Sequence, residues 1–110
     1  EIEAELVARA RALGPQLRAT AAETEANRSV LKSNMQAVFD NQLVRFFQPK
    51  RHGGFELEWG AQFAIGREVA KHCPSTAWIV SVVGAHSCFL GRMPGAVQDE
   101  VWGPNQDQLI

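Results

Sequence analysis

Glycine and proline divide this chain of 110 residues into short segments in which apolar residues recur every three or four positions. Such spacing places the apolar side chains on one face of an α-helix. The breaks stand at Gly14-Pro15, Gly53-Gly54, Pro74, Gly91 and Gly103-Pro104. The pattern predicts an all-α fold of five or six helices.

The first segment, residues 1–13, carries an apolar stripe formed by Ile2, Leu6 and Ala10. Gly14-Pro15 then interrupts the pattern, and two interpretations stay open. Pro15 begins a second helix that runs towards Arg28, because proline suits a first helical turn, or one helix continues with a kink at the proline.

Ser33 and Gln36 have the spacing of a capping box, which predicts a helix that begins directly after Ser33. Its apolar stripe consists of Met35, Val38, Phe39 and Leu43. We expect Asn41 to end this helix in the left-handed conformation, which a short polar side chain tolerates.

Residues 43–55, "LVRFFQPKRHGGF", show no helical period and predict a buried turn. Phe46 and Phe47 are expected to anchor it, Pro49 fixes one backbone dihedral, and Gly53-Gly54 permit a tight reversal.

The next helix is expected over residues 58–72, with an inner side formed by Trp59, Phe63, Ile65, Gly66 and Val69. Pro74 ends it, because the residue before a proline is disfavoured in the helical conformation. A further helix, capped by Ser75 or Thr76, runs to about Leu90. A short helix follows over residues 95–102, and the last letters, "NQDQLI", favour an extended segment.

The helix expected after Pro74 carries Trp78, Val82 and His86 at positions i, i+4 and i+8. Eight residues rise about 12 Å and turn about 80° beyond two full turns. The two polar-tipped rings therefore lie on broadly the same side of the helix, at opposite ends of one wall.

Small residues, namely Ser81, Gly84 and Ala85, stand between the two rings. They let another backbone or a flat ligand come close. The imidazole is suited to hydrogen bonding or proton exchange near neutral pH, and the indole offers a flat apolar surface. The spacing also fits a tryptophan in the core and a histidine satisfied by a backbone carbonyl, and this alternative stays open.

Charge and hydropathy exclude two classes of partner. The formal net charge is -1 at pH 7, which implies no basic face for nucleic acid. The longest apolar run, residues 77–85, is far too short to cross a membrane, and because the N-terminus is acidic and polar we expect no signal peptide. Two cysteines make no disulfide framework, so we expect a cytoplasmic protein.

His72-Cys73 and His86-Ser87-Cys88 contain side chains that zinc accepts. Neighbours on a helix point about 100° apart, and the chain has no CxxC or HxxxH pair, so we expect no metal site and buried structural thiols. The letters "KRHGGF" lack both GxGxxG and GK[ST], which favours a structural turn over a phosphate loop.

The chain begins at Glu1 without an initiator methionine and ends where an extended segment is expected. We therefore expect residues 1–110 to be one domain of a longer protein.

Three stretches resemble a known family: "LVRFFQPKRHGGFELEW", "VAKHCPSTAWIVSVVGAHS" and "DEVWGPNQDQLI". They are similar to the N-terminal helical domain of flavin-dependent monooxygenases with the acyl-CoA dehydrogenase fold. These are oxygenase components of two-component aromatic hydroxylases, including those acting on 4-hydroxyphenylacetate. The resemblance covers about residues 6–110. It implies that a β-barrel and a C-terminal helical bundle complete the protein outside this chain.

In that family a separate reductase supplies reduced flavin, FMN or FAD, which binds mainly to the other two domains. It reacts with molecular oxygen to give a C4a-hydroperoxide, which hydroxylates an aromatic substrate. The resemblance implies that Trp78, Val82 and His86 line the substrate pocket and that His86 hydrogen-bonds a phenolic oxygen. It also implies a homo-oligomer, a tetramer at full length, and an isolated chain that binds no flavin and is inactive.

The chain departs from the family at His52, where tyrosine is common, and at Asn41-Gln42, where the family has Ala-Gly. Two other functions stay open. One is the N-terminal domain of an acyl-CoA dehydrogenase, which shares the turn. The other is a stand-alone helical interaction domain that binds a partner through Phe46, Phe47 and Trp102.

Overall fold

The computed structural model describes residues 1–110 as six α-helices and one 3-10 turn, without a β-strand. The elements are α1 (Ile2–Ala19), α2 (Ala21–Asn27), α3 (Lys32–Asp40), η1 (Lys50–His52), α4 (Ala61–Ala70), α5 (Pro74–Leu90) and α6 (Gly95–Trp102). The all-α prediction is confirmed, with six helices. None of them combines the length and the apolar character that crossing a bilayer requires.

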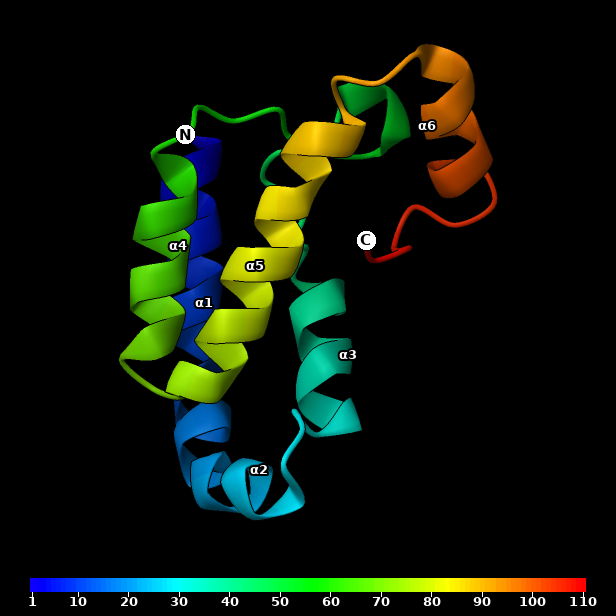
Figure 1. Cartoon of the computed structure of the whole chain (residues 1–110). Coiled ribbons are helices and arrows are strands. Elements are labelled where there is room, and N and C mark those ends of the chain that lie inside the picture. Colours follow the sequence, from blue (N-terminus) through cyan, green and yellow to red (C-terminus); the bar gives the residue numbers. More distant parts are fainter.

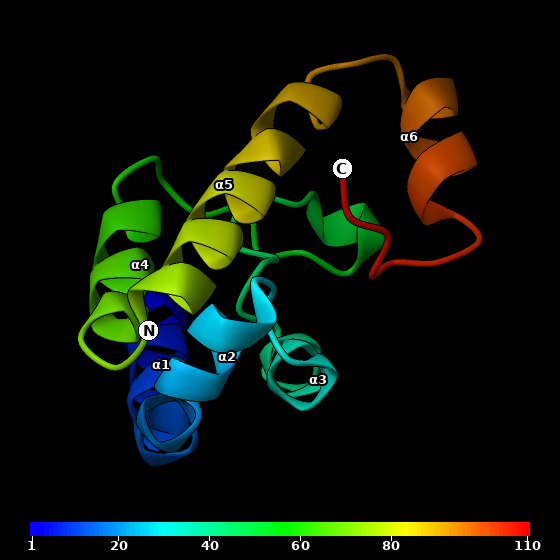
Figure 2. The same ribbon diagram turned by 60° about the horizontal axis from the view of Figure 1, so that its bottom comes forward.

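Helices α1, α4 and α5 run side by side and form the body of the molecule (Figure 1). Helix α4 packs against both of the others, while α2 and α3 cover the end and one flank of this group (Figure 2). Helix α6 stands apart from the bundle in both views, and the chain after it turns back towards the middle of α5. The overall dimensions are 41 × 29 × 18 Å, so the molecule is a slab rather than a sphere.

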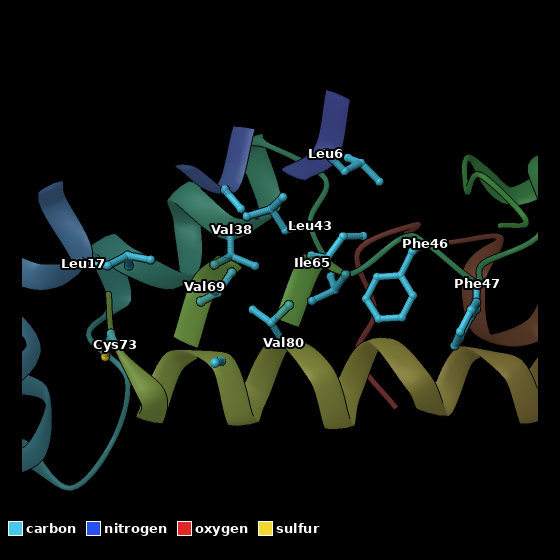
Figure 3. Packing of buried hydrophobic residues seen from close by; sticks show 13 residues of the cluster. Leu6, Leu17, Val38, Leu43, Phe46, Phe47, Ile65, Val69, Cys73 and Val80 are labelled. Atoms are coloured by element: carbon cyan, nitrogen blue, oxygen red, sulfur yellow. The ribbon is translucent and has the colours of Figure 1, made fainter. Parts of the chain in front are cut away.

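The core lies between the inner face of α5 and the elements above it (Figure 3). Its largest fully buried members include Leu6 and Leu17 of α1, Ile65 of α4 and Val80 of α5. Burying each such side chain contributes about 1.5–3 kcal/mol. Because these residues come from three helices, the core holds the bundle together as one unit.

The segment between α3 and α4 is the buried turn that the sequence predicts. Phe46 is fully buried, and its ring meets the ring of Phe47 edge-on at a centroid distance of 4.7 Å. The turn closes on itself through the N–H of Phe55, which donates to the carbonyl of Arg45 at 3.1 Å. Gly53 has a φ of 83°, the left-handed conformation that glycine adopts without strain.

Helix α1 continues through Gly14 and Pro15, so the interpretation with a single helix holds for this segment. Leu17, beyond the proline, is as deeply buried as Leu6 before it. This shared packing keeps the helix continuous although Pro15 cannot donate a backbone hydrogen bond.

The capping-box prediction for α3 is wrong. The helix begins at Lys32, with Leu31 as N-cap and no side-chain capping bond, so Ser33 lies inside the first turn. Gln36 instead donates to Asp40 at 2.9 Å. The buried side chain of Asn34, which donates to Thr20 and accepts from Gln16, fixes the start of the helix.

The end of α3 also differs from the expectation, because Asn41 has a φ of -94° and Gln42 is the left-handed residue, with a φ of 57°. The side-chain amide of Asn41 caps the carbonyl of Ala37 at 2.8 Å. Arg9 of α1 donates to the side chain of Gln42 at 3.1 Å. A positive φ is the conformation that glycine adopts with least strain at the end of a helix, so Gln42 adopts it at some cost.

Helix α4 is shorter than predicted, and two of its expected inner residues are exposed. Ile65 and Val69 are fully buried, whereas the side chains of Trp59 and Phe63 are 55% and 63% exposed. Phe63 lies about 200° around the helix from Ile65, so both cannot face the core. Trp59 precedes the helix and stacks on Phe47, with ring centroids 5.3 Å apart.

Helix α5 begins at Pro74 with Cys73 as N-cap, so neither Ser75 nor Thr76 is the cap. Thr76 points inwards, where its hydroxyl donates to the sulfur of Cys73 at 3.2 Å. The predicted ends of α5 at Leu90 and of α6 at Trp102 are confirmed.

A buried carboxylate joins α1 to α4. The side chain of Glu68 is only 4% exposed and accepts hydrogen bonds from Arg11 at 2.9 Å and from His72 at 3.3 Å. Burial by itself raises the pKa of this carboxyl. The hydrogen bonds from Arg11 and His72 and the charges of Lys71 and Arg11 outweigh burial, so the pKa of Glu68 lies below its usual value.

We predict that Glu68→Gln destabilises the chain by about 1–2 kcal/mol at neutral pH, because Arg11 and His72 lose a charged acceptor. A lowered carboxyl pKa stabilises the fold above the ordinary value of 4.5 and loses this effect as the pH falls below it. The difference between wild type and variant should therefore shrink between pH 7 and about pH 3 in urea unfolding. Glu100→Gln, on the exposed face of α6, should change stability by less than about 0.5 kcal/mol at both values. A difference that stays constant with pH would contradict the assigned role of Glu68.

We also predict that Gly84→Ala destabilises the chain, although alanine favours a helix by about 1 kcal/mol. A Cβ at this position would lie 2.3 Å from the ring of Phe46, which is fully buried and has no room to move. The expected net loss is about 1–2 kcal/mol, measured by chemical unfolding. Gly60→Ala is the matched control, because a Cβ there meets no atom within 4 Å. Equal unfolding midpoints for the two variants would refute this account of Phe46.

Candidate functional site

Helix α5 has a sealed inner face and an open outer face. Val80 is fully buried and Ala77 nearly so, whereas Trp78 is 70% exposed, and Val82 and His86 are half-buried. The alternative of a core tryptophan is therefore wrong. The three residues that the sequence singles out lie along a part of α5 that the chain leaves accessible.

The space beside the small residues Gly84 and Ser81 of α5 is filled by other parts of this chain. The ring of Phe46 packs directly on Gly84, and the hydroxyl of Ser81 lies against Gly66 of α4, 2.5 Å from where a Cβ would stand. The close approach expected at these positions is thus made by α4 and by the buried turn. They bring the bundle together and do not form a ligand slot.

The indole of Trp78 stands between two surface hollows. One, of about 570 Å³, lies between α2 and the start of α5, where Arg28 supplies a cation. The other, of about 530 Å³, lies between α4 and α5 and is shared with Phe63. Both hollows are open to solvent, so Trp78 presents a flat apolar surface to whatever lies next to this face.

His86 lies two turns further along α5 and lines neither hollow. Its Nδ1 lies 2.6 Å from the main-chain carbonyl oxygen of Ile110, and Nε2 has no hydrogen-bond partner within the chain. The alternative of a histidine satisfied by a carbonyl therefore holds for one ring nitrogen. The structure leaves the other nitrogen free.

Two side chains of the turn bind α6. Arg51 and His52 bind the carboxylate of Asp99 at 2.6 Å and 3.1 Å. The hydrogen bond from Arg51 is the main cause that holds the pKa of Asp99 below its usual value, against a smaller opposing effect of burial. The arrangement supports a structural turn rather than a phosphate loop.

The cysteines and histidines named in the sequence do not converge. His72 contacts Glu68 and Arg18, while Cys73 is buried in the core. No three His, Cys, Asp or Glu side chains lie close enough to hold a metal ion.

The surface proposed for an interaction domain is also absent. Phe46 and Trp102 are fully buried, and Phe47 is 9% exposed. The exposed aromatic residues are instead Trp59, Phe63, Trp78 and Phe89.

Sequence reasoning missed the residues that hold the chain end beside His86. Arg45 in the turn binds Asp107 at 2.6 Å, and Gln48 donates to the carbonyl of Gln106 at 2.9 Å. Arg45 and Asp107 are 62 positions apart. No periodicity or motif signals such a pair, so only the folded structure identifies it.

The fold identifies the class of protein. The all-α chain matches part of the crystal structure of 3-HSA hydroxylase from Rhodococcus sp. RHA1, which has an acyl-CoA dehydrogenase-like fold, with a TM-score of 0.91 at 32% identity over 96% of this chain and 27% of that one. The chain matches no family model.

Comparison with individual proteins identifies the relatives more closely. The chain is 33% identical over 99 residues to the oxygenase subunit HsaA, a flavin-dependent monooxygenase of Rhodococcus jostii. The aligned region covers 90% of this chain and 26% of that protein. It is 29% identical to the oxygenase component of an FADH2-dependent resorcinol hydroxylase from a Rhizobium species, over 96% of this chain and 26% of the relative. It is 31% identical to the oxygenase component of p-hydroxyphenylacetate 3-hydroxylase from Acinetobacter baumannii, over 84% and 22%.

The fold agrees with these relatives. The crystal structure of the HsaA monooxygenase from M. tuberculosis superposes with a TM-score of 0.92 at 29% identity, over 97% of this chain and 29% of that one. The chain is thus homologous to oxygenase components of two-component flavin-dependent aromatic hydroxylases, which confirms the resemblance seen in the sequence. It spans about a quarter of the length of the relatives it matches.

Proposed function

We propose that this chain forms one wall of the substrate pocket in a reduced-flavin-dependent monooxygenase that hydroxylates a phenolic ring. The observation that carries the proposal is the state of His86: one ring nitrogen is held by a carbonyl, and the other is free on the accessible side of α5. The homology to aromatic hydroxylases supports the same assignment.

In this proposal His86 hydrogen-bonds the hydroxyl oxygen of the substrate, while Trp78 and Val82 supply apolar surface beside the ring. A hydrogen bond that draws the hydroxyl proton towards the imidazole increases the electron density of the aromatic ring. A more electron-rich ring reacts faster with an electrophilic oxygen donor. The histidine therefore binds the substrate and activates it in one contact.

Reduced flavin, FMN or FAD, supplies the activation of molecular oxygen when it is bound. Trp78, which is 70% exposed, is assigned to the substrate ring, and no residue of this chain is assigned to the flavin. The hollows beside it are open, so we propose that other parts of the full-length protein hold most of the cofactor.

Residues 1–110 are, in this proposal, the N-terminal helical domain, followed by a β-barrel and a C-terminal helical bundle. The full-length protein acts in the cytoplasm as a homo-oligomer, a tetramer, and receives its reduced flavin from a separate reductase. The chain by itself is catalytically inactive.

We predict that His86→Ala in the full-length oxygenase lowers the amount of hydroxylated product per oxygen consumed by about 100-fold. Oxygen consumption by reduced flavin should continue, because His86 acts on the substrate. Parallel measurement of oxygen uptake and product formation with a panel of phenols tests this. Phe89→Ala, at the exposed end of the same helix, should keep the wild-type ratio. Unchanged coupling in His86→Ala would remove the proposed role.

A further inference from the structure

The contact at Nδ1 fixes which nitrogen of His86 carries the proton. The partner is the carbonyl oxygen of Ile110, at 2.6 Å, and a carbonyl oxygen can only accept a hydrogen bond. Nδ1 must therefore be the N–H donor. In the neutral ring Nε2 then carries the lone pair and can only accept.

The position of Ile110 depends on an irregular segment that lies across α5, here called the strap and defined as residues 106–110. The strap leaves a space of only about 10 Å³ between itself, the turn and the side chains of Val83 and Ser87. This volume is at the lower limit for a single water molecule. The strap therefore lies close to α5, and its Leu109 is partly buried against the hydrophobic core.

Arg45 is the main anchor of the strap. Its guanidinium, on a side chain only 12% exposed, donates to the carboxylate of Asp107 at 2.6 Å and to the side-chain oxygen of Gln106 at 3.4 Å. The same group also donates to the carbonyl of Gly53 at 3.2 Å, so the turn fixes its direction. A charge-assisted pair held in this way is stronger and more directional than an exposed one.

Gln48 provides a second anchor from the same turn. Its side-chain amide is 3% exposed and donates to the carbonyls of Gln106 at 2.9 Å and His52 at 2.6 Å. The buried Gln48 and the largely buried Arg45 thus hold the strap, and the carbonyl of its last residue meets His86.

We propose that Arg45 is a positioning residue, which acts through the strap to hold His86 with Nδ1 protonated and Nε2 free as an acceptor. The proposal rests on the proposed function of His86 and adds the direction of the hydrogen bond: Nε2 accepts it and the substrate donates it. The group recognised by Nε2 must donate a hydrogen bond, so the pocket selects a ring bearing a free hydroxyl. It disfavours the matching O-methyl ether, which has no proton to give.

The first test is the tautomer of His86 in the proposed full-length oxygenase, where Ile110 carries a peptide carbonyl, measured by long-range ¹H–¹⁵N correlation of the imidazole. His86→Gln identifies the signals of this ring. We expect the Nδ1–H form in wild type, and a mixture of both neutral tautomers in Arg45→Met and in Asp107→Asn. Asp107 is 42% exposed, so its variant remains informative if Arg45→Met fails to fold.

Arg51→Met is the matched control. Arg51 lies in the same turn and forms an ion pair of the same length, 2.6 Å, with Asp99 of α6 and not with the strap. It should leave the tautomer of His86 unchanged. An Nε2–H form in wild type, or an unchanged tautomer in a folded Arg45 or Asp107 variant, overturns the proposal.

The second test is product per oxygen consumed in the full-length oxygenase. We expect Arg45→Met to lower this ratio by about 10-fold, Arg45→Lys to recover most of the loss, and Arg51→Met to keep the wild-type value. An unchanged ratio in Arg45→Met together with a loss in His86→Ala refutes the positioning role alone. An unchanged ratio in His86→Ala refutes the proposed function, whatever the tautomer measurement gives.

Discussion

The packing of α5 against the ring of Phe46 is the contact on which the rest of the structure depends. Gly84 lets this ring come within van der Waals contact of the helix backbone, and Val80, one turn earlier, closes the core beside it (Figure 3). The same contact places the turn that follows α3 against the middle of α5. Because that turn carries Arg45, the core contact also determines where the C-terminal strap is anchored.

One helix therefore performs two tasks. Its inner face, through Ala77 and Val80, joins α4 and the turn, while Trp78 and His86 remain on accessible surface. A helix that is apolar almost throughout is expected to be buried all round. In this slab-shaped chain the outer face of α5 is left open, and we propose that the remaining parts of a longer oxygenase close a pocket over it.

Sequence periodicity predicted the helical class, the buried turn and the positions of α5 and α6, because these follow from local patterns of apolar and breaker residues. It failed where tertiary contacts decide. Ser33 does not cap α3, since the buried amide of Asn34 fixes the helix start. Phe63 faces solvent because Ile65 takes the core position. The spacing of Trp78 and His86 indicated one wall, but the pairing that orients His86 joins residues 24 positions apart and has no signature in the sequence.

The most direct test of the central claim is a crystal structure of the full-length oxygenase with a bound phenol. The account predicts that Nε2 of His86 lies about 3 Å from the ligand hydroxyl, with Nδ1 still on the carbonyl of Ile110 and Trp78 beside the ring. A ligand whose hydroxyl is bound elsewhere, with Nε2 of His86 covered by another part of the protein, would contradict it.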